Sequence, residues 1–296
     1  MINNPRDALF KEDYFHPGHP LCPGCPGGMA LRWIMKVLGR DSIANVGATC
    51  LCLPTHVYPH SLEIPSLYIA MAPSPAGISG MSAAIRILKR KGVIPAEKRI
   101  TVFAISGDGS TADIGMAALS GAAERNDDGL YFCFDNEAYM NTGIQRSSTT
   151  PQFSWTFSTT KGKVQRKKDL PKIMAAHDIP YVATLSVAYP EDFVRKVEKA
   201  RDMGPGFKYF QIHGPCPTGW RFPEHKTVEV ARLAVETGFW SLYEVVHGSF
   251  NITYRPRKRL PVVDYVKLQG RFQGLTAQDI RTLQNWVDEK EEGPGS

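Results

Sequence analysis

The chain has 296 residues, of which 43% are hydrophobic, and this length allows one large buried core or one core with a smaller appendage. Its 35 Lys and Arg residues are spread among 29 Asp and Glu residues, so the net charge of +6 favours an acidic partner or an anionic ligand and argues against a nucleic-acid-binding protein. The chain does not open with a charged segment followed by an apolar one, and no stretch approaches the ~20 apolar residues of a membrane span, so we expect a cytoplasmic protein that does not bind a membrane.

Alternating strands and helices are predicted in the first half of the chain. The apolar spacing of residues 27–40 and 77–92 is typical of helices. Residues 99–106 and 129–135 are continuous runs of β-branched and aromatic residues, as expected of strands buried on both faces of a parallel sheet. Residues 111–125, between these runs, have the composition of a helix. The unit is therefore strand, glycine-rich turn, helix and strand.

The same alternation continues further along the chain, with helices predicted at 170–180 and 190–203 and strands at 181–187 and 207–213. Strands that alternate with helices of this length are connected by right-handed crossovers. The sequence therefore predicts an α/β fold with a doubly wound parallel sheet.

Two segments flank the predicted sheet. The first twenty residues are rich in Pro, His and charge and are predicted to form an N-terminal arm. From residue 221 onward, a helix at 227–238 is mixed with irregular, proline-rich and basic stretches. We therefore expect one domain over residues 1–220 and an extension over residues 221–296 that packs on this domain or on a partner subunit.

A basic segment separates the two halves of the predicted sheet. Its cations could dock an acidic redox partner or a phosphate-bearing substrate, although a solvated loop is the simpler interpretation. They are Lys161, Lys163, Arg166, Lys167 and Lys168.

Six cysteines occur in a chain that we expect in a reducing compartment, where disulfide frameworks are disfavoured. They are therefore candidates for metal ligation or for burial as small hydrophobic side chains. The pair in the sequence CPGC, Cys22 and Cys25, could bind zinc or an iron–sulfur cluster or bond to each other, and two cysteines alone do not decide between these. The remaining four are Cys50, Cys52, Cys133 and Cys216.

A glycine-flanked aspartate follows the predicted strand at 99–106, at the end of the strand where ligands bind in an open parallel sheet. In the sequence SGDGS, Asp108 offers a carboxylate beside free backbone N–H groups at a helix N-terminus, which suits a magnesium-bound diphosphate. The GDG triplet alone does not identify a cofactor site, because Asp-Gly is common in ordinary turns. Asn136 follows the next strand, and with the carbonyl of Ala138 it would bring the protein oxygens on magnesium to three. This order of strand, GDG, helix, strand and Asn is typical of thiamine diphosphate enzymes.

Four stretches extend this pattern into a family resemblance. The sequence DNEAYMNTGIQRSSTTP at 135–151 closely resembles the β subunits of 2-oxoacid:ferredoxin oxidoreductases, especially the pyruvate enzymes with separate subunits. SGDGSTADIG at 106–115, LAVETGFWSLYEV at 233–245 and FNITYRPRKRLPVVDYVKLQGRF at 250–272 resemble the same subunits. The similarity therefore covers nearly the whole chain.

The resemblance implies the thiamine-diphosphate-binding fold and a role for each site residue. Magnesium is expected on Asp108, Asn136 and the Ala138 carbonyl, and the diphosphate near Gly107, Gly109 and Ser110. Asn141, Thr142 and Gln145 are expected near the thiazolium ring and the bound oxoacid. Asn141 is the candidate for a hydrogen bond to the substrate adduct, and its alternative role is an ordinary loop cap.

The resemblance also implies that one 4Fe–4S cluster is held by Cys22, Cys25, Cys50 and Cys216. From spacing alone, zinc in a four-cysteine site is at least as probable, because tetrahedral thiolates suit both. The thiamine pattern favours the cluster, because electrons released from a thiamine-bound substrate need an acceptor. Cys52 and Cys133 fall outside the set, and Cys133 lies within an apolar strand.

By the same resemblance, the reaction is the oxidative decarboxylation of a 2-oxoacid, pyruvate-like or aromatic such as phenylglyoxylate, to acyl-CoA and carbon dioxide. The chain would act only with an α subunit that supplies the catalytic glutamate, with γ and ferredoxin-like δ subunits, and with ferredoxin, or NAD through a flavin subunit, as acceptor. Two alternatives remain: a non-redox thiamine diphosphate decarboxylase or carboligase, and a zinc-bearing binding module.

Overall fold

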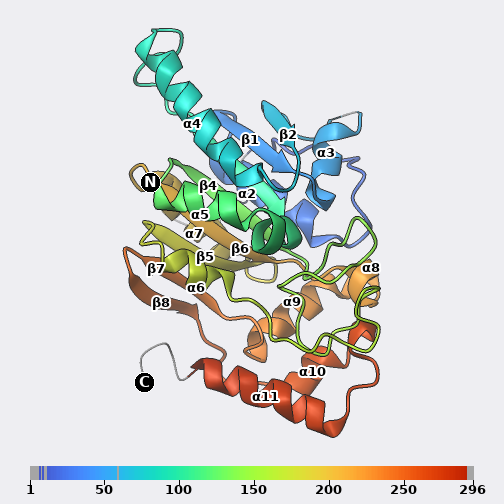
Figure 1. The fold of residues 1–296 in the computed structure, drawn as a ribbon. Helices are drawn as coiled ribbons and strands as arrows, with labels where there is room; N and C mark the ends of the chain where they lie inside the picture. Colours follow the sequence, from blue (N-terminus) through green and yellow to red (C-terminus); the bar gives the residue numbers. More distant parts are fainter. Residues whose placement is uncertain (1–6, 8, 10–11, 59, 292–296) are drawn as a thin grey trace.

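The computed structural model describes residues 7, 9, 12–58 and 60–291. Within these residues, eight strands form one sheet in the order β2-β1-β3-β4-β6-β5-β7-β8 (Figure 1). Neighbouring strands among the first six pair in parallel, whereas β7 pairs antiparallel with both β5 and β8. The strands are β1 (Ser42–Gly47), β2 (Ser66–Ile69), β3 (Thr101–Gly107), β4 (Gly129–Asp135), β5 (Tyr181–Ser186), β6 (Phe207–His213), β7 (Leu242–Val246) and β8 (Ser249–Tyr254).

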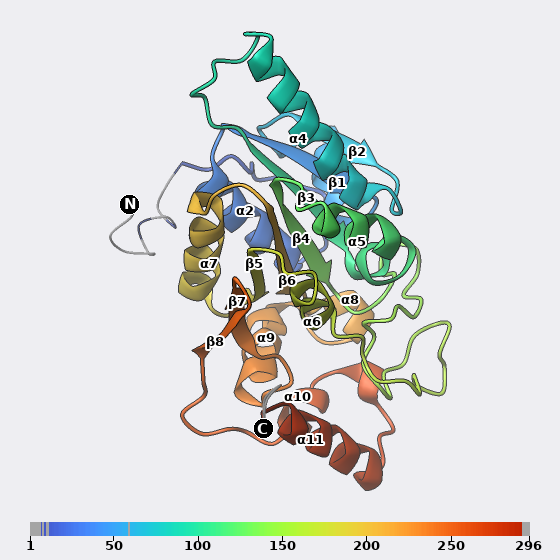
Figure 2. The ribbon, with the colours of Figure 1, turned by 60° about the vertical axis from the view of Figure 1, so that its left-hand side comes forward.

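Helices cover both faces of the sheet (Figures 1 and 2). α2 (Pro26–Leu38) and α7 (Pro190–Asp202) pack together over one hydrophobic cluster, and α4 (Ser74–Arg90), α5 (Met116–Glu124) and α6 (Leu170–Ala175) cover a second cluster. None of the helices that the structure describes is long and apolar enough to cross a membrane. The α-helices not yet named are α3 (Leu53–His56), α8 (Pro217–Trp220), α9 (Thr227–Glu236), α10 (Val262–Val266) and α11 (Ala277–Glu291).

Strand β4 shows why the central strands are hydrophobic along their whole length. Leu130, Phe132 and Phe134 point into the first cluster, whereas Tyr131 and Cys133 point into the second. A strand with helices on both faces buries both sets of alternating side chains, so its sequence is continuously apolar. The predicted doubly wound α/β fold is confirmed, and so are its predicted central strands.

The sequence analysis expected a helix mixed with irregular stretches from residue 221 onward and predicted no strand at residues 242–254. This segment forms the hairpin of β7 and β8, which extends the sheet beyond β5. His247 and Gly248 lie between the strands with φ of 44° and 79°. Positive φ at both positions of a two-residue loop is typical of the turn that closes a β-hairpin. A helix, α11, also follows where no element was predicted.

The helix predicted at 111–125 is interrupted near its start. Ser110–Ile114 form a π-helical turn, and α5 begins only at Met116. Gly115 allows the change, because a Cβ atom at this position would lie 2.4 Å from the carbonyl oxygen of Ser110. A widened turn therefore directly follows the glycine-flanked aspartate.

The C-terminal residues contribute to a third hydrophobic cluster. It joins Trp220 to residues of α9, α10 and α11, among them Val230, Tyr265 and Val287. Residues from both sides of position 220 thus share one cluster, and the division of the chain at this position stays a prediction.

Replacing Phe210 with Ala is expected to lower the free energy of unfolding by about 3–5 kcal/mol. Phe210 is fully buried on β6 and stacks on Phe132 with 4.6 Å between ring centroids. Denaturant unfolding measures the loss. Phe157→Ala is the control, because that ring is 62% exposed and its loss should change stability by less than about 1 kcal/mol. Equal losses in the two variants would contradict the assignment of Phe210 to the core.

Candidate functional site

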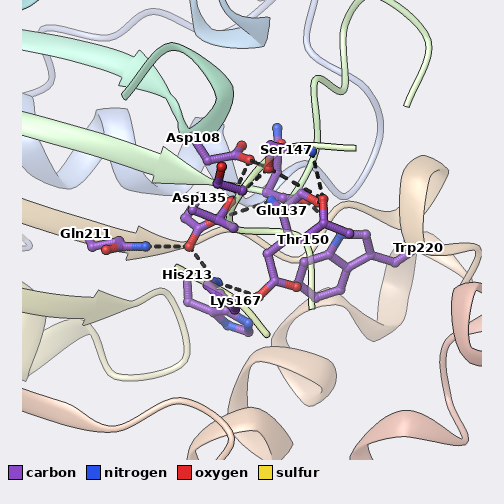
Figure 3. A network of polar contacts seen from close by, with 12 residues as sticks. Asp108, Asp135, Glu137, Ser147, Thr150, Lys167, Gln211, His213 and Trp220 are labelled. Carbon is purple, nitrogen blue, oxygen red and sulfur yellow. Dashed lines mark hydrogen bonds and ion pairs between the residues drawn. The ribbon is translucent and has the colours of Figure 1, made fainter. Parts of the chain in front are cut away.

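The carboxyl ends of β3 and β4 bring the two predicted magnesium ligands together. The strands pair in parallel with Gly107 beside Phe134, so the residues that follow each strand leave the sheet side by side (Figure 3). The amide end of the Asn136 side chain lies 3.0 Å from Oδ1 of Asp108 and 2.9 Å from the carbonyl oxygen of Ala138. In the orientation that satisfies both oxygens, the amide nitrogen donates to each of them. A rotation of the amide by half a turn directs its oxygen to the same place.

These distances fit a magnesium ion. In an octahedron with bonds of about 2.1 Å, neighbouring ligand oxygens lie about 3.0 Å apart. Oδ2 of Asp108 already accepts hydrogen bonds from Ser147 at 2.5 Å and Thr149 at 2.7 Å, so Oδ1 is the oxygen left for a ligand. The residues present therefore match the requirements of the implied ion.

The electrostatics of Asp108 also favour a cation. Burial raises the pKa of its carboxyl well above the ordinary value, and the nearby charge of Asp135 raises it further. Among the described residues, no Lys or Arg forms an ion pair with Asp108. A buried carboxylate without a cationic partner is unfavourable, and a divalent cation at Oδ1 would compensate its charge.

Close packing defines the turn between β3 and the π-helical segment. A Cβ atom at Gly109 would lie 2.5 Å from the ring of Tyr139, whose hydroxyl donates to the Gly109 carbonyl at 3.1 Å. A Cβ atom at Gly107 would lie 3.0 Å from the hydroxyl oxygen of Thr49. The Ser110 hydroxyl donates to the carbonyl of Met71 at 2.6 Å. The loop that is expected to approach the diphosphate is thus ordered by its neighbours.

The NTGIQ segment forms a compact turn at the surface. The Thr142 hydroxyl donates to Oε1 of Gln145 at 2.6 Å, and Nε2 of Gln145 donates back to the Thr142 carbonyl at 3.0 Å. Asn141 and Thr142 are exposed. No hydrogen bond in the described part of the chain joins these residues to Asp108 or Asn136. Their predicted roles near the thiazolium ring and the substrate stay predictions.

The structure brings the four predicted cluster cysteines into one neighbourhood. The pKa of the Cys25 thiol is raised to about 11, mainly by burial and in part by charge on Cys216 and Cys22. Burial likewise raises the pKa of Cys50, and charge on the other three thiols adds to that rise. Thiols affect each other's pKa in this way only when they lie close together.

The four thiols do not form the ligand set of a single metal ion in this structure. Within the described residues, no group of three or more His, Cys, Asp or Glu side chains is arranged to hold a single metal ion. In a 4Fe–4S cluster each thiolate binds a different iron, so its ligands lie further apart than those of one zinc ion. Cys52 and Cys133 are buried in the two hydrophobic clusters of the sheet. The sequence analysis predicted burial in the core for Cys133 but not for Cys52.

The sequence analysis missed a buried ion network close to Asp108 (Figure 3). Lys167 Nζ lies 2.6 Å from Oδ2 of Asp135 and 2.6 Å from Oε1 of Glu137. Arg271 Nη2 lies 2.6 Å from Oε2 of Glu137, and Gln211 donates to Asp135 at 2.5 Å. Two acids that flank Asn136 in the sequence DNE, next to a strand end, were the signal that cationic partners were needed.

Glu137 occupies a special position in this network. It lies between Asn136 and Ala138 with φ of 64°, in the left-handed region that few residues other than Gly adopt. Burial alone would raise the pKa of its carboxyl, but the charges of Lys167 and Arg271 outweigh burial and lower the pKa to about 2. The ion pairs therefore hold the backbone that presents the two predicted magnesium ligands, Asn136 and the Ala138 carbonyl.

The prediction of a solvated basic loop at 161–168 was wrong for two of its five cations. Lys167 belongs to the buried network, and Lys163 is 1% exposed. Lys163 Nζ donates to the carbonyls of Ser148 at 2.9 Å and Thr150 at 2.6 Å. It thereby fixes the turn that presents hydroxyl groups to Asp108. Long cationic side chains look alike in the sequence whether they reach water or a buried acceptor.

A comparison with protein families agrees with this geometry. The family described as thiamine pyrophosphate enzyme, C-terminal TPP binding domain, matches residues 47–212, which is more than half of the chain. The matched segment contains β3, β4 and the converging residues Asp108 and Asn136. The chain is therefore a member of the thiamine diphosphate enzymes.

Individual relatives narrow the family. Pyruvate synthase subunit PorB of Methanocaldococcus jannaschii is 50% identical over 286 residues, covering 95% of this chain and 96% of that protein. Ketoisovalerate oxidoreductase subunit VorB of Pyrococcus abyssi is 46% identical over 289 residues, covering 95% and 92%. The chain belongs to the β subunits of the 2-oxoacid:ferredoxin oxidoreductase family, which are oxidoreductase subunits that act with partner subunits. The predicted family is thus confirmed.

A solved structure shares the fold. The 2-oxoglutarate:ferredoxin oxidoreductase of Magnetococcus marinus, with 2-oxoglutarate, coenzyme A and succinyl-CoA bound, matches with a TM-score of 0.58. The match covers 100% of this chain and 94% of that chain at 18% sequence identity.

Replacing Glu137 with Ala is expected to lower the free energy of unfolding by about 3–5 kcal/mol, because Lys167 and Arg271 would keep buried charges without a partner. Glu137→Gln, which keeps the shape and one acceptor oxygen, should cost less. Chemical denaturation measures both losses. Glu97→Ala is the control at an exposed acid and should change stability by less than about 1 kcal/mol. A Glu137→Ala variant as stable as the control would contradict the role of the ion pairs.

Proposed function

We propose that this chain is the β subunit of a coenzyme A-dependent 2-oxoacid:acceptor oxidoreductase. The complex would convert a 2-oxoacid to acyl-CoA and carbon dioxide and pass two electrons to ferredoxin or a related acceptor. The convergence of Asp108, Asn136 and the Ala138 carbonyl at magnesium spacing carries this proposal. The names of the relatives, pyruvate synthase and ketoisovalerate oxidoreductase, support the reaction class.

In this proposal, Asp108, Asn136 and the Ala138 carbonyl hold the magnesium ion, and Gly107, Gly109 and Ser110 adjoin the diphosphate. When bound, thiamine diphosphate supplies a nucleophilic ring carbon and a ring nitrogen that stores the electron pair released with carbon dioxide. The protein supplies position and charge. Ser147 and Thr149 hold the carboxylate of Asp108 in one orientation, so that Oδ1 meets the ion without rearrangement.

Asn141, Thr142 and Gln145 are proposed to contact the substrate. The bond between Thr142 and Gln145 fixes the turn, and the exposed Asn141 amide can donate to an oxygen of the substrate adduct. Two side chains restrained by each other lose little entropy on binding, which favours a role in orientation.

Cys22, Cys25, Cys50 and Cys216 are proposed to hold a 4Fe–4S cluster. Such a cluster accepts electrons one at a time. It could therefore take up, in two steps, the two electrons that the oxidation of the oxoacid releases. The gathering of these thiols from separate segments supports the assignment over a free dithiol.

The partners are proposed from the family. An α subunit would complete the thiamine site with the catalytic glutamate, and γ and ferredoxin-like δ subunits would carry electrons to ferredoxin, or to NAD through a flavin subunit. The substrate is proposed to be pyruvate or a closely related 2-oxoacid. A branched oxoacid is the second candidate because a ketoisovalerate oxidoreductase subunit is 46% identical. A panel of 2-oxoacids, aromatic ones included, assayed with the complete anaerobic complex decides between them.

Replacing Asp108 with Asn in the complete complex is expected to lower oxoacid-dependent reduction of ferredoxin at least about 100-fold, because the only carboxylate among the proposed magnesium ligands is lost. Magnesium-dependent binding of thiamine diphosphate, measured by calorimetry, should weaken as well. Asp178→Asn is the matched control: this residue is exposed and has a left-handed φ that Asn tolerates. Full activity of Asp108→Asn would refute the magnesium site.

Anaerobically purified wild-type protein is expected to contain about four irons per chain and to absorb broadly near about 400 nm. Cys216→Ser should lose most of this iron, whereas Cys52→Ser should keep it, because Cys52 lies outside the proposed set. Iron analysis and absorption spectra measure both. Stoichiometric zinc without iron would refute the cluster and favour the zinc-binding alternative.

A further inference from the structure

Trp220 links the loop that bears Cys216 to residues 136–140, which contain two proposed magnesium ligands and are called the magnesium loop below. It is the last residue of α8, the short helix that directly follows Cys216, and its backbone N–H donates to the Cys216 carbonyl at 2.8 Å. Its indole Nε1–H donates to the backbone carbonyl of Asn136 at 2.8 Å (Figure 3). The side chain is 1% exposed. One buried residue thus bonds to a proposed cluster ligand and to a proposed magnesium ligand.

Arg271 forms a second link at the next position of the magnesium loop. Its guanidinium carbon lies 3.5 Å from the centre of the Trp220 ring, and its Nη2 lies 2.6 Å from Oε2 of Glu137. The arginine is 2% exposed. The indole and the guanidinium therefore bind two consecutive residues of the loop, Asn136 through its backbone and Glu137 through its side chain.

The two loops also pack directly against each other. A Cβ atom at Gly219 would lie 2.1 Å from the sulfur of Met140, so a larger residue there would displace the Met140 side chain. The backbone N–H of Gly219 donates to the Cys216 thiol at 3.3 Å. A shift of the Cys216 loop therefore meets Met140, four residues after Asn136, as well as Trp220.

We propose that Trp220, held by Arg271, is a positioning residue that couples the cysteine set to the magnesium loop, so that occupancy of one centre changes affinity at the other. The inference rests on the proposed function, because it assumes that both centres are filled. Plain core packing would not need the indole N–H, whereas the coupling depends on it: this bond satisfies the buried Asn136 carbonyl and transmits a displacement of the Cys216 loop. Coupling between two binding sites is reciprocal. If loss of the cluster lowers the affinity for thiamine diphosphate by some factor, loss of thiamine diphosphate lowers the affinity for the cluster by the same factor.

The test measures the dissociation constant of thiamine diphosphate, by equilibrium dialysis with saturating magnesium, on the complete anaerobic complex. Trp220→Phe keeps an aromatic ring under Arg271 and removes only the N–H donor. It is expected to weaken binding about fivefold, the effect of one lost hydrogen bond. Chelation of iron should weaken binding by a similar factor in the wild type and by less than about twofold in Trp220→Phe.

Trp155→Phe is the matched control. Trp155 also lies under an arginine, with the guanidinium carbon of Arg221 3.7 Å from its ring centre, but its indole forms no hydrogen bond to the magnesium loop within the described residues. This variant should bind the cofactor like the wild type and keep the full effect of iron removal. The melting temperature of each protein is measured in parallel.

Three outcomes would overturn the inference: wild-type affinity in Trp220→Phe, an equal loss of affinity in Trp155→Phe, or an effect of iron removal that is the same with and without the Trp220 indole. If the first of these comes with a lower melting temperature of Trp220→Phe, the residue contributes packing alone. Wild-type protein that lacks iron would refute the proposed cluster and the coupling with it, whereas any of these outcomes in iron-containing protein would overturn the inference alone.

Discussion

Three buried carboxylates crowd the ends of β3 and β4, and the arrangement of the site depends on how their charges are compensated. Asp135 and Glu137 share the ammonium group of Lys167, and Glu137 also meets Arg271. Asp108 receives hydroxyl donors from Ser147 and Thr149 but no ion pair within the described residues. Charge that is paired by the protein fixes the loop, and charge that is left unpaired marks the place for a cation.

This division of charge explains an unusual backbone. Glu137 carries a left-handed φ of 64°, which costs free energy for a residue with a side chain. The conformation directs the Asn136 amide and the Ala138 carbonyl toward Asp108 while the Glu137 side chain points into the ion network. The buried salt bridges are therefore better understood as a device for local geometry than as a source of net stability.

Some parts of this site were predictable, and others were not, for identifiable reasons. Asp108 and Asn136 were predicted because residues that follow parallel strands meet at one edge of a sheet. Lys167 was placed in a solvated basic loop, because its sequence neighbours are polar and nothing local shows that its ammonium group reaches two buried acids. Trp220 and Arg271 gave no signal, since the residues that they bind in the site, Asn136 and Glu137, lie more than eighty residues away in the chain. The hairpin of β7 and β8 was missed although Gly248, which takes a positive φ in its turn, is visible in the sequence.

The sequence by itself determined the fold class and the family, and it pointed to the two strand-end residues that converge in the structure, because hydrophobic periodicity and short motifs are local. Only the tertiary structure decided that four cysteines from three distant segments share one neighbourhood, and that an indole joins one of them to Asn136. It also decided which cations are buried. Contacts of this kind depend on how distant segments pack. The free energy of burying a charge depends on the partners that surround it in space, and the neighbouring residues in the sequence do not reveal those partners.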